Sequence, residues 1–402
     1  MSAHDPYFAR LEKLLQEQGD GRPTAILDLD RLERNADKLK ERLPPAFAAG
    51  GLRLVNKSLP SPQLLRFLAD RLGCRKQMVF HWPFLVEAAA HFPHHDFLFG
   101  KPMPVQGAEA ALARFATTHF DVSRNVQWLI DTPQRLTQYR ELARRRGIRL
   151  RISLEIDVGL HRGGAASPED LGPLLRQIAE DPDHLEFSGF LGYDAHVGKL
   201  PGWLESRQAS LEKSRERYRA FREWGSRNFP ELFGGEKIFN GAGSPTFLLH
   251  GEDGPINEVA LGSVLVKPEH FELDILSDFE PAFYIATPVL KSLPGTSLPG
   301  LEAISKIVAP LVGRDRTYFI YGGRWMATPC SPPGLRTNEM YGKSLNQAIL
   351  NGPATPALEV DDWVFLRPQE SEAVMLQFGD LLAVQGGKLA GRWPVFAESR
   401  QA

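Results

Sequence analysis

Two hydrophobic periods alternate along the first two thirds of the chain. Short apolar runs, such as 24–28 and 52–55, are separated by longer stretches in which apolar residues recur every three or four positions, as in 30–43. The runs are typical of strands covered on both faces, and the longer stretches are typical of amphipathic helices. About eight such strand–helix units, with a total length of roughly 240 residues, predict an α/β fold with a (β/α)8 TIM barrel. An open doubly wound sheet is the alternative, but no Gly-x-Gly-x-x-Gly motif follows an early strand.

The pattern changes after about residue 267. Helical spacing fades, and short apolar runs recur between prolines and glycines, at 281–289, 306–312, 317–320, 362–366 and 381–384. Such runs predict a mostly β C-terminal domain. Phe8, Leu11 and Leu14 share one helical face near the N-terminus. We therefore expect a barrel over 24–266, and a β-rich second domain that combines 267–402 with 1–23 and its helix.

Composition narrows the class of protein. The 402 residues carry a net charge of -2, from 47 basic and 49 acidic side chains. This balance gives no reason to expect nucleic acid or an anionic membrane as a partner. Cys74 and Cys330 are too few for a disulfide framework or a zinc cluster. Neither a signal peptide nor an apolar run of about 18 residues is found. We expect a cytoplasmic protein that acts on a small molecule.

The stretch 51–58 predicts a short buried strand that ends on Lys57. Burial of a lysine at the mouth of an apolar barrel disfavours the ammonium form. The neutral amine is the form that makes a Schiff base with an aldehyde cofactor. By itself, the stretch also fits a lysine that only begins the next loop.

A glycine-rich segment, Asn-Gly-Ala-Gly-Ser-Pro-Thr at 240–246, follows a late predicted strand. Small residues allow the backbone to approach a ligand closely, so that several N–H groups can point at one phosphate. We expect a helix to begin near Ser244 and to add the positive end of its dipole. Phosphate sites in (β/α)8 enzymes often follow strands seven and eight, where this loop falls. An ordinary glycine turn is the alternative.

Residues 155–164, Glu-Ile-Asp-Val-Gly-Leu-His-Arg-Gly-Gly, end another predicted strand. Charged residues at the carboxyl end of a strand indicate the barrel mouth, where active sites lie. Arg162 could bond to a phenolic oxygen or a phosphate. The alternatives are an ion-paired loop, or a metal site made by Glu155, Asp157 and His161.

The following strand ends in Gly-Tyr-Asp-Ala-His at 192–196. Tyr193 could reach the pyridine ring of a cofactor. His196 could move protons near neutral pH. A structural histidine is the alternative.

Together these segments resemble the D-threonine aldolase and D-serine dehydratase branch of the alanine-racemase-like, pyridoxal phosphate (PLP)-dependent enzymes of fold type III. The matching segments are 22–35, 54–58, 155–164, 240–246 and 258–263. The segment 155–164 is the most specific match. The resemblance covers residues 22 to about 265, and continues more loosely to 392–395.

The resemblance implies a PLP-binding barrel, a β domain, and a homodimer whose sites lie near the subunit boundary. It places Lys57 as the Schiff base and as a proton relay. Arg162 would lie near the phenolic oxygen of the cofactor and Tyr193 near its pyridine ring. The phosphate would be held by Gly241, Gly243 and Ser244.

The chain departs from this branch at two places. Many members carry a His-x-Cys or His-x-Asp pair near the C-terminus, and its metal binds the β-hydroxyl of the substrate. Here Glu370 and Glu372 occupy the comparable positions. On one strand both carboxylates would share a face and could meet Mg²⁺ or Mn²⁺, although we expect no metal site and no zinc. Asn56 and Ser58 stand where members often have His and Thr.

The leading hypothesis is a PLP-dependent lyase that acts on a β-hydroxy D-amino acid, by retro-aldol cleavage or by dehydration, with catalytic residues Lys57 and His196. A PLP-dependent amino-acid racemase or epimerase is the first alternative, with Tyr341 as its second base. A non-catalytic PLP-binding protein is the second. A barrel enzyme of another kind, in which Lys57 has no chemical role, is the last.

Overall fold

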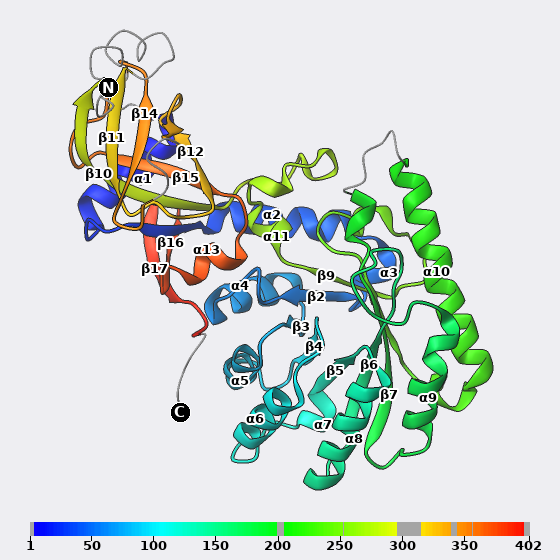
Figure 1. The fold of residues 1–402 in the computed structure, drawn as a ribbon. Helices are drawn as coiled ribbons and strands as arrows, with labels where there is room; N and C mark the ends of the chain where they lie inside the picture. Colours follow the sequence, from blue (N-terminus) through cyan, green and yellow to red (C-terminus); the bar gives the residue numbers. More distant parts are fainter. Residues whose placement is uncertain are drawn as a thin grey trace, which may run out of the picture. The chain divides into compact units, whose positions relative to one another are not determined.

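The computed structural model describes residues 4–198, 205–251, 253–295, 315–338, 344–355 and 357–397. The chain forms two compact units (Figure 1). One unit contains 36–265, 273–278 and 396–402, and the other contains 1–35, 266–272 and 279–395. Each unit is described separately below.

The first unit is a closed barrel of eight parallel strands. The strands are β2 (Leu52–Val55), β3 (Lys76–Val79), β4 (Asp96–Phe99), β5 (Val126–Ile130), β6 (Leu150–Glu155), β7 (Leu185–Gly192), β8 (Ile238–Gly241) and β9 (Glu258–Leu261). The barrel closes where Leu52 of β2 pairs with Val259 of β9. The predicted (β/α)8 barrel is therefore confirmed.

Helices surround these strands (Figure 1). They are α3 (Pro45–Ala48), α4 (Pro62–Leu72), α5 (Trp82–His91), α6 (Val105–Phe115), α7 (Val122–Asn125), α8 (Pro133–Arg146), α9 (Leu171–Ala179) and α10 (Arg207–Asn228). Their ends follow local rules. For example, Thr132 accepts the Arg135 N–H at the start of α8, and Gly147 ends that helix in a left-handed conformation.

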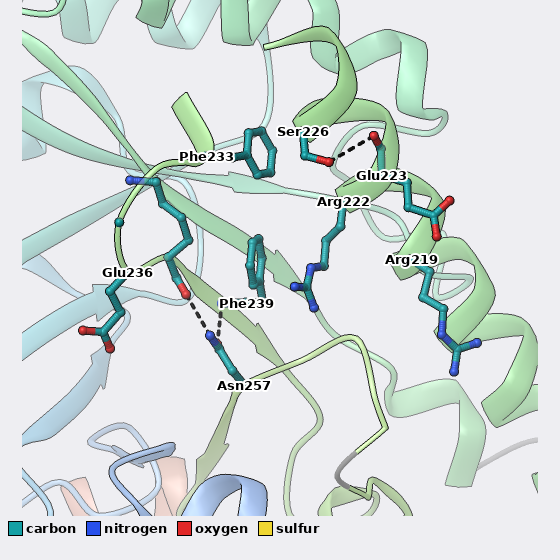
Figure 2. Close-up of a pocket in the computed structure, with 10 residues that line it drawn as sticks. Arg219, Arg222, Glu223, Ser226, Phe233, Glu236, Phe239 and Asn257 are labelled. Carbon is teal, nitrogen blue, oxygen red and sulfur yellow. Dashed lines mark hydrogen bonds between the residues drawn. The ribbon is translucent and has the colours of Figure 1, made fainter. Parts of the chain in front are cut away.

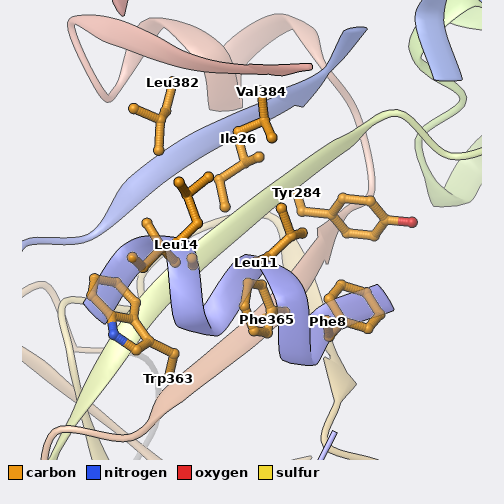
Figure 3. Close-up of a cluster of buried hydrophobic side chains, with 11 residues drawn as sticks. Phe8, Leu11, Leu14, Ile26, Tyr284, Trp363, Phe365, Leu382 and Val384 are labelled. Atoms are coloured by element: carbon orange, nitrogen blue, oxygen red, sulfur yellow. The ribbon is translucent and has the colours of Figure 1, made fainter. Parts of the chain in front are cut away.

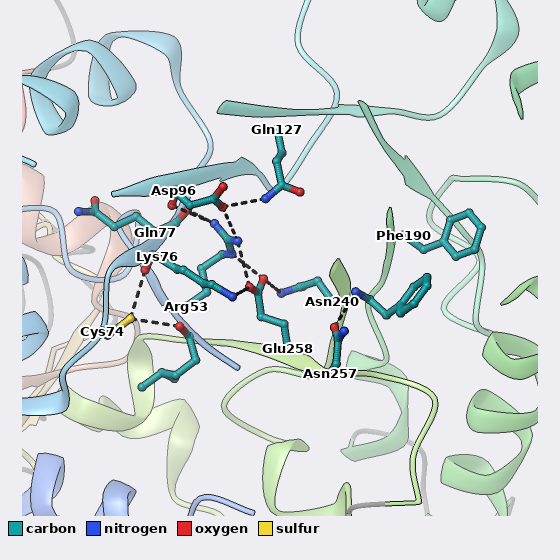
Figure 4. A network of polar contacts seen from close by, with 12 residues as sticks. Arg53, Cys74, Lys76, Gln77, Asp96, Gln127, Phe190, Asn240, Asn257 and Glu258 are labelled. Atoms are coloured by element: carbon teal, nitrogen blue, oxygen red, sulfur yellow. Dashed lines mark hydrogen bonds and ion pairs between the residues drawn. The ribbon is translucent and has the colours of Figure 1, made fainter. Parts of the chain in front are cut away.

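The interior of the barrel contains a buried polar network (Figure 4). Arg53 on β2 is fully buried. Its guanidinium donates to Glu258 over 2.6 Å and to Asp96 over 2.7 Å. Further donors to these two carboxylates are Lys76, Gln127, Arg151 and Asn240. Burial alone would raise the pKa of Asp96, but Arg53 and Arg151 lower it. The network therefore pairs the fully buried charges of Arg53 and Glu258, whereas its outer members Asp96, Arg151 and Lys76 remain partly exposed.

The second unit is built on a sheet of nine strands among the described residues. These are β1 (Thr24–Asp28), β10 (Phe283–Pro294), β11 (Arg316–Tyr321), β12 (Ala327–Ser331), β13 (Arg336–Thr337), β14 (Gln347–Gly352), β15 (Trp363–Pro368), β16 (Asp380–Gln385) and β17 (Lys388–Pro394). This unit also contains the short helix α13 (Glu372–Leu376). Two helices contain residues of both units, α2 (Leu29–Arg42) and the short α11 (Ser263–Val266). A mostly β second domain is thus confirmed.

The N-terminal helix α1 (Pro6–Gln18) lies against this sheet (Figure 3). Its apolar face contributes Phe8, Leu11 and Leu14 to a buried cluster that includes Tyr284 and Phe365. The Phe8 and Phe365 ring centroids are 4.8 Å apart. Asp5 begins the helix by accepting the N–H groups of residues 7 and 8. The helical spacing seen in the sequence therefore marks the face that packs on the sheet.

Three local predictions differ from the structure. The strand 24–28, which we assigned to the barrel, instead pairs with β10 and β16, because the pattern of a buried strand does not specify its partner. The helix expected near Ser244 is only a 3-10 turn at Phe247–Leu249, since glycines and a proline follow it. The predicted strand at 306–312 lies outside the described residues, as does Tyr341.

Among the described residues, no helix has the length and apolar character needed to cross a lipid bilayer.

Candidate functional site at the carboxyl ends of the barrel strands

Lys57 lies just beyond the carboxyl end of β2. Its side chain is half-buried, and Nζ lies 4.7 Å from the centroid of the Phe80 ring, at the end of β3. The absence of a side chain at Gly100, after β4, leaves room for this ring, because a Cβ there would come within 2.4 Å of Phe80. Three adjacent strands therefore position the lysine on an aromatic face.

Two hydrogen bonds connect the Lys57 loop to the glycine-rich loop. Ser263, after β9, donates its hydroxyl to Ser58 Oγ over 3.2 Å. The next residue, Val264, donates its N–H to Ser244 Oγ over 3.2 Å. Strand β9 lies between β2 and β8 in the barrel, so these bonds join three neighbouring strand ends. The predicted lysine and the predicted phosphate loop are therefore neighbours.

Tyr193 and Arg162 continue this line of contacts around the barrel. The Tyr193 ring packs on the glycine-rich loop, where a Cβ at Gly243 would lie 2.9 Å from Tyr193 Cε2. The guanidinium carbon of Arg162 is 5.2 Å from the centroid of the same ring. A Cβ at Gly241 would collide with Ile256, at 2.8 Å. The predicted residues Lys57, Ser244, Gly243, Tyr193 and Arg162, which follow four of the strands, thus lie around one side of the barrel mouth.

His196, which follows β7, packs against the loop that follows β6. Gly159 of that loop has a φ of +115°, and a Cβ there would lie 3.0 Å from His196 Nε2. Burial lowers the pKa of His196, so the imidazole is neutral near pH 7. Its Nδ1 is buried without a hydrogen-bond partner among the described residues.

The acidic residues of segment 155–164 do not converge. Asp157 accepts the N–H groups of Gly159 and His161, and its second oxygen lies 2.6 Å from His161 Nδ1. These bonds overcome burial and lower the pKa of Asp157. Glu155 stands apart: burial raises its pKa, and Arg162 opposes that rise. Asp157 and His161 therefore stabilise the conformation of their own loop.

Three residues that hold the glycine-rich loop in place, one of them its last residue Thr246, were not predicted as site residues from the sequence. Buried Asp194 accepts the Thr246 hydroxyl over 2.7 Å, and His250 Nε2 lies 2.7 Å from its other oxygen. Thr246 Oγ1 in turn accepts the Gly243 N–H over 3.2 Å. Asp194 stands between Tyr193 and His196 in the sequence, so its position next to two predicted site residues was the available signal.

Glu370 and Glu372 do not share a strand face. Strand β15 ends at Pro368, Glu370 lies in the connecting loop, and Glu372 opens α13. Glu370 Oε1 is 3.5 Å from His270 Nδ1, and both side chains are about half exposed. Among the described residues, no group of three or more His, Cys, Asp or Glu side chains is arranged to hold a metal ion. The premise that the two glutamates share one strand is therefore wrong.

A surface cavity of about 640 Å³ lies at the opposite strand ends (Figure 2). It is lined by Lys237, which precedes β8, by Asn257, which precedes β9, and by Arg222 and Phe239. Arg222 stacks on the Phe239 ring at 4.0 Å and donates to the Pro255 carbonyl. None of the predicted site residues lines this cavity.

Comparison with known proteins gives a consistent result. The family described as "Alanine racemase, N-terminal domain" matches residues 27–269. A curated 3-hydroxy-D-aspartate aldolase from Paracoccus denitrificans is 24% identical over 398 residues, covering 94% of this chain and 92% of the relative.

Solved structures match over nearly the whole chain. A D-threonine aldolase from Filomicrobium marinum superimposes with a TM-score of 0.71 at 19% identity, covering 94% of this chain and 97% of that one. A D-threo-3-hydroxyaspartate dehydratase from Delftia sp. HT23 gives 0.72 at 18% identity, covering 94% and 98%. One structure of a D-threo-3-hydroxyaspartate dehydratase is of a cysteine-to-alanine mutant in a metal-free form. An alanine racemase from Bacillus anthracis gives 0.67 at 14% identity, covering 92% and 97%.

Proposed function

Because the chain belongs to the alanine racemase N-terminal domain family, we propose that it is a PLP-dependent lyase that acts on a β-hydroxy D-amino acid. The reaction would be retro-aldol cleavage or dehydration. The observation that carries this proposal is the line of contacts at the barrel mouth. It starts at Ser58, next to Lys57, and passes through the Ser263 and Ser244 loops to Tyr193 and Arg162.

The residues at the mouth fit PLP. The cofactor needs an amine, a phosphate cradle and a flat polar wall, and this site provides Lys57, the loop around Gly243 and the Tyr193 ring. Both polar atoms of the Asn56 amide, next to Lys57, are buried without a hydrogen-bond partner among the described residues, as is His196 Nδ1. Orphaned polar atoms of this kind are typical of sites that hold a polar ligand.

Each residue has a proposed task. Lys57 Nζ would hold the cofactor and then carry a proton to and from it. Arg162 would stabilise negative charge on the phenolic oxygen, because a guanidinium stays charged at all working pH values. Tyr193 would face the pyridine ring. Gly241, Gly243 and Ser244 would surround the phosphate, with the Ser244 hydroxyl as a donor.

PLP, when bound, supplies an electron sink for charge that develops at the substrate Cα. The protein residues supply the proton transfers. His196, which burial keeps neutral, can accept a proton, and this suits the removal of a hydroxyl proton in a retro-aldol step. After it has accepted this proton, the imidazolium of His196 can return it in a later step.

The substrate class is proposed from the relatives. The aldolase from Paracoccus denitrificans and the dehydratase from Delftia sp. HT23 are both named for a 3-hydroxyaspartate. Their names share a β-hydroxy amino acid and differ in the bond broken. The proposal therefore includes both lyase reactions, and it requires that the substrate carry a β-hydroxyl group.

A divalent metal is proposed only as an addition to be tested. The Glu370 carboxylate, 3.5 Å from His270 Nδ1, offers hard oxygen donors suited to Mg²⁺ or Mn²⁺ rather than to a thiolate-bound ion. We expect chelator treatment followed by Mn²⁺ to change the activity less than it would for an enzyme with an intact His-x-Cys pair. Full loss with the chelator and full recovery with Mn²⁺ would show that a metal is required.

The cofactor assignment is tested by absorbance spectra of the wild type and Lys57→Ala, before and after borohydride. We expect a long-wavelength PLP band in the wild type that reduction abolishes and that the variant lacks. A wild type that shows no such band, even with added PLP, contradicts the proposal. Lys101→Ala, an exposed lysine after β4, is the matched control and should keep the band.

A substrate panel separates the lyase from the alternatives. Formation of an aldehyde from β-hydroxy D-amino acids indicates an aldolase, and formation of a 2-oxo acid indicates a dehydratase. Solvent deuterium entering Cα with loss of optical activity indicates the racemase alternative. A stable PLP complex that is inert toward every amino acid indicates a non-catalytic PLP-binding protein.

We also propose a homodimer in the cytoplasm. The dimer rests on the resemblance described above, and the compartment rests on the composition of the chain. Sedimentation velocity of the purified protein tests the dimer directly.

A further inference from the structure

The glycine-rich loop rests on a buried chain of hydrogen bonds. The Gly243 N–H donates to Thr246 Oγ1 over 3.2 Å, and Thr246 Oγ1 donates to Asp194 over 2.7 Å. The other Asp194 oxygen lies 2.7 Å from His250 Nε2. Asp194, Thr246 and His250 are all buried, with 2%, 0% and 5% of their surface exposed. We call these three residues the loop anchor.

The loop anchor has a fixed direction. A threonine hydroxyl has one proton, and here a carboxylate takes it. The lone pairs of Thr246 are therefore left to accept the Gly243 N–H. Because an ionised carboxylate cannot donate, the ring nitrogen of His250 must carry the proton in its bond to Asp194. The direction of each hydrogen bond in the chain is thus fixed.

The anchored turn holds a strained backbone. The Gly243 carbonyl accepts the N–H groups of Thr246 and Phe247, at 2.9 and 3.0 Å. Ala242, just before Gly243, has a φ of +56°, a left-handed conformation that an alanine rarely adopts. Backbone in this conformation beside a glycine is typical of concave anion sites. The loop anchor therefore stabilises the loop shape that an anion would need.

The loop anchor also connects the turn to Tyr193, the residue proposed to face the pyridine ring. Asp194 directly follows Tyr193, and the Tyr193 ring packs against Gly243. The end of β7 thus holds the turn twice, by the ring of Tyr193 and by the carboxylate of Asp194.

We infer that Asp194, Thr246 and His250 position the glycine-rich loop for the phosphate ester of the cofactor, so that the protein selects the phosphorylated form over free pyridoxal. This inference rests on the proposed function for the identity of the ligand. The three residues are positioning residues, because they act through the Gly243 backbone.

The test compares Thr246→Val with Thr246→Ser in the apo protein. Valine has the shape of threonine but neither donates nor accepts, whereas serine keeps the hydroxyl. We expect Thr246→Val to bind PLP about tenfold more weakly, because both hydrogen bonds of the buried hydroxyl are lost and the loop is held less firmly. Thr246→Ser should bind within about threefold of the wild type. Affinity for pyridoxal should change by less than about twofold in both variants, because pyridoxal makes no use of the loop.

A second pair covers the case in which Thr246→Val does not fold. Gln at position 250 can still donate to Asp194, whereas Leu cannot. We expect His250→Gln to keep the preference for PLP over pyridoxal, and His250→Leu to reduce it. Equal PLP affinity within each pair overturns the inference, and so does a parallel loss of PLP and pyridoxal affinity.

The outcome is distinguishable from failure of the proposed function. If the wild type forms no Lys57-dependent PLP band, the proposed function fails. Inorganic phosphate then serves as the probe: it should raise the melting temperature of the apo wild type and of Thr246→Ser more than that of Thr246→Val. The same rise in all three proteins overturns the positioning role.

Discussion

At the scale of single residues, burial at the barrel mouth shifts the pKa values of two ionisable side chains. Glu155 and His196 are both shifted by burial toward their neutral forms, the carboxyl to a higher pKa and the imidazole to a lower one. Ionisable groups whose pKa values are shifted by burial are common in sites that exchange protons with a substrate. Stability then depends on pH through these groups.

Wild type should lose stability relative to His196→Asn as the pH falls from 8 to 5. The unfolded chain binds a proton at His196 below its ordinary pKa of about 6.5, whereas the folded protein does so only at lower pH. Stability is therefore lost as the pH drops through that window. Melting temperatures at several pH values measure the effect, with the exposed His119→Asn as the control. A constant difference between wild type and His196→Asn would argue against a lowered pKa.

The candidate site could be predicted from the sequence where local motifs mark it. Lys57, Arg162 and Tyr193 each end a predicted strand, and parallel strands bring such ends together. Thr246 and His250 could not be predicted, because their role depends on a contact with Asp194 more than 50 positions away in the sequence. Nothing in the residues around a threonine indicates such a partner.

At the scale of elements, close contact between β7 and β8 depends on Gly189. The residue has a φ of +141° at a register shift in β7, and a Cβ would lie 1.8 Å from the Ile238 carbonyl oxygen. Only glycine can therefore occupy this position without moving one strand.

We expect Gly189→Ala to lower the free energy of unfolding by at least ~3 kcal/mol, because backbone strain and overpacking add. The shift in the urea midpoint measures this loss. Gly234→Ala is the control, since its Cβ would meet no atom within 4 Å. A variant at 189 as stable as this control would contradict the proposed close contact.

Element types were more predictable than their partners. The buried strand 24–28 was predicted correctly, but its place in the second sheet follows from antiparallel pairing with β10 and parallel pairing with β16. A strand covered on both faces has no polar side to identify its neighbours. One element type was missed: the sequence of 338–350 indicates an irregular or briefly helical segment, whereas strand β14 begins there at Gln347.

At the scale of the whole molecule, the barrel is closed around charge rather than around apolar side chains alone. Arg53 lies between Glu258 and Asp96, and these side chains belong to β2, β9 and β4. The network thus joins strands that are distant in the sequence. It also makes the barrel sensitive to the loss of any one charge.

Replacement of Arg53 by Met should destabilise the barrel by about 3–5 kcal/mol, because the fully buried Glu258 loses its main partner and the partly buried Asp96 loses one of its donors. Arg145→Met provides the comparison. Arg145 is about half exposed and pairs with Glu109 at 3.8 Å, so its loss should cost less than about 1 kcal/mol. Urea unfolding measures both variants, and similar midpoints would contradict the role of the network.

Phe396 offers a fourth prediction. Its ring stacks on Phe84 with centroids 5.0 Å apart, its N–H donates to the Pro60 carbonyl, and only 1% of its surface is exposed. Phe396→Ala should cost about 3–5 kcal/mol, and Phe396→Leu should cost clearly less. Thermal unfolding ranks the two. An alanine variant that melts with the wild type would show that this contact does not form in solution.

The chain passes between the two units five times, after residues 35, 265, 272, 278 and 395. The barrel strands form one continuous stretch, but the whole barrel unit does not, and its last segment carries Phe396 from the end of the chain. A clone that stops after the barrel strands would lose that segment. Recombination between relatives would need several crossovers to exchange one unit, so the two units are expected to be inherited together.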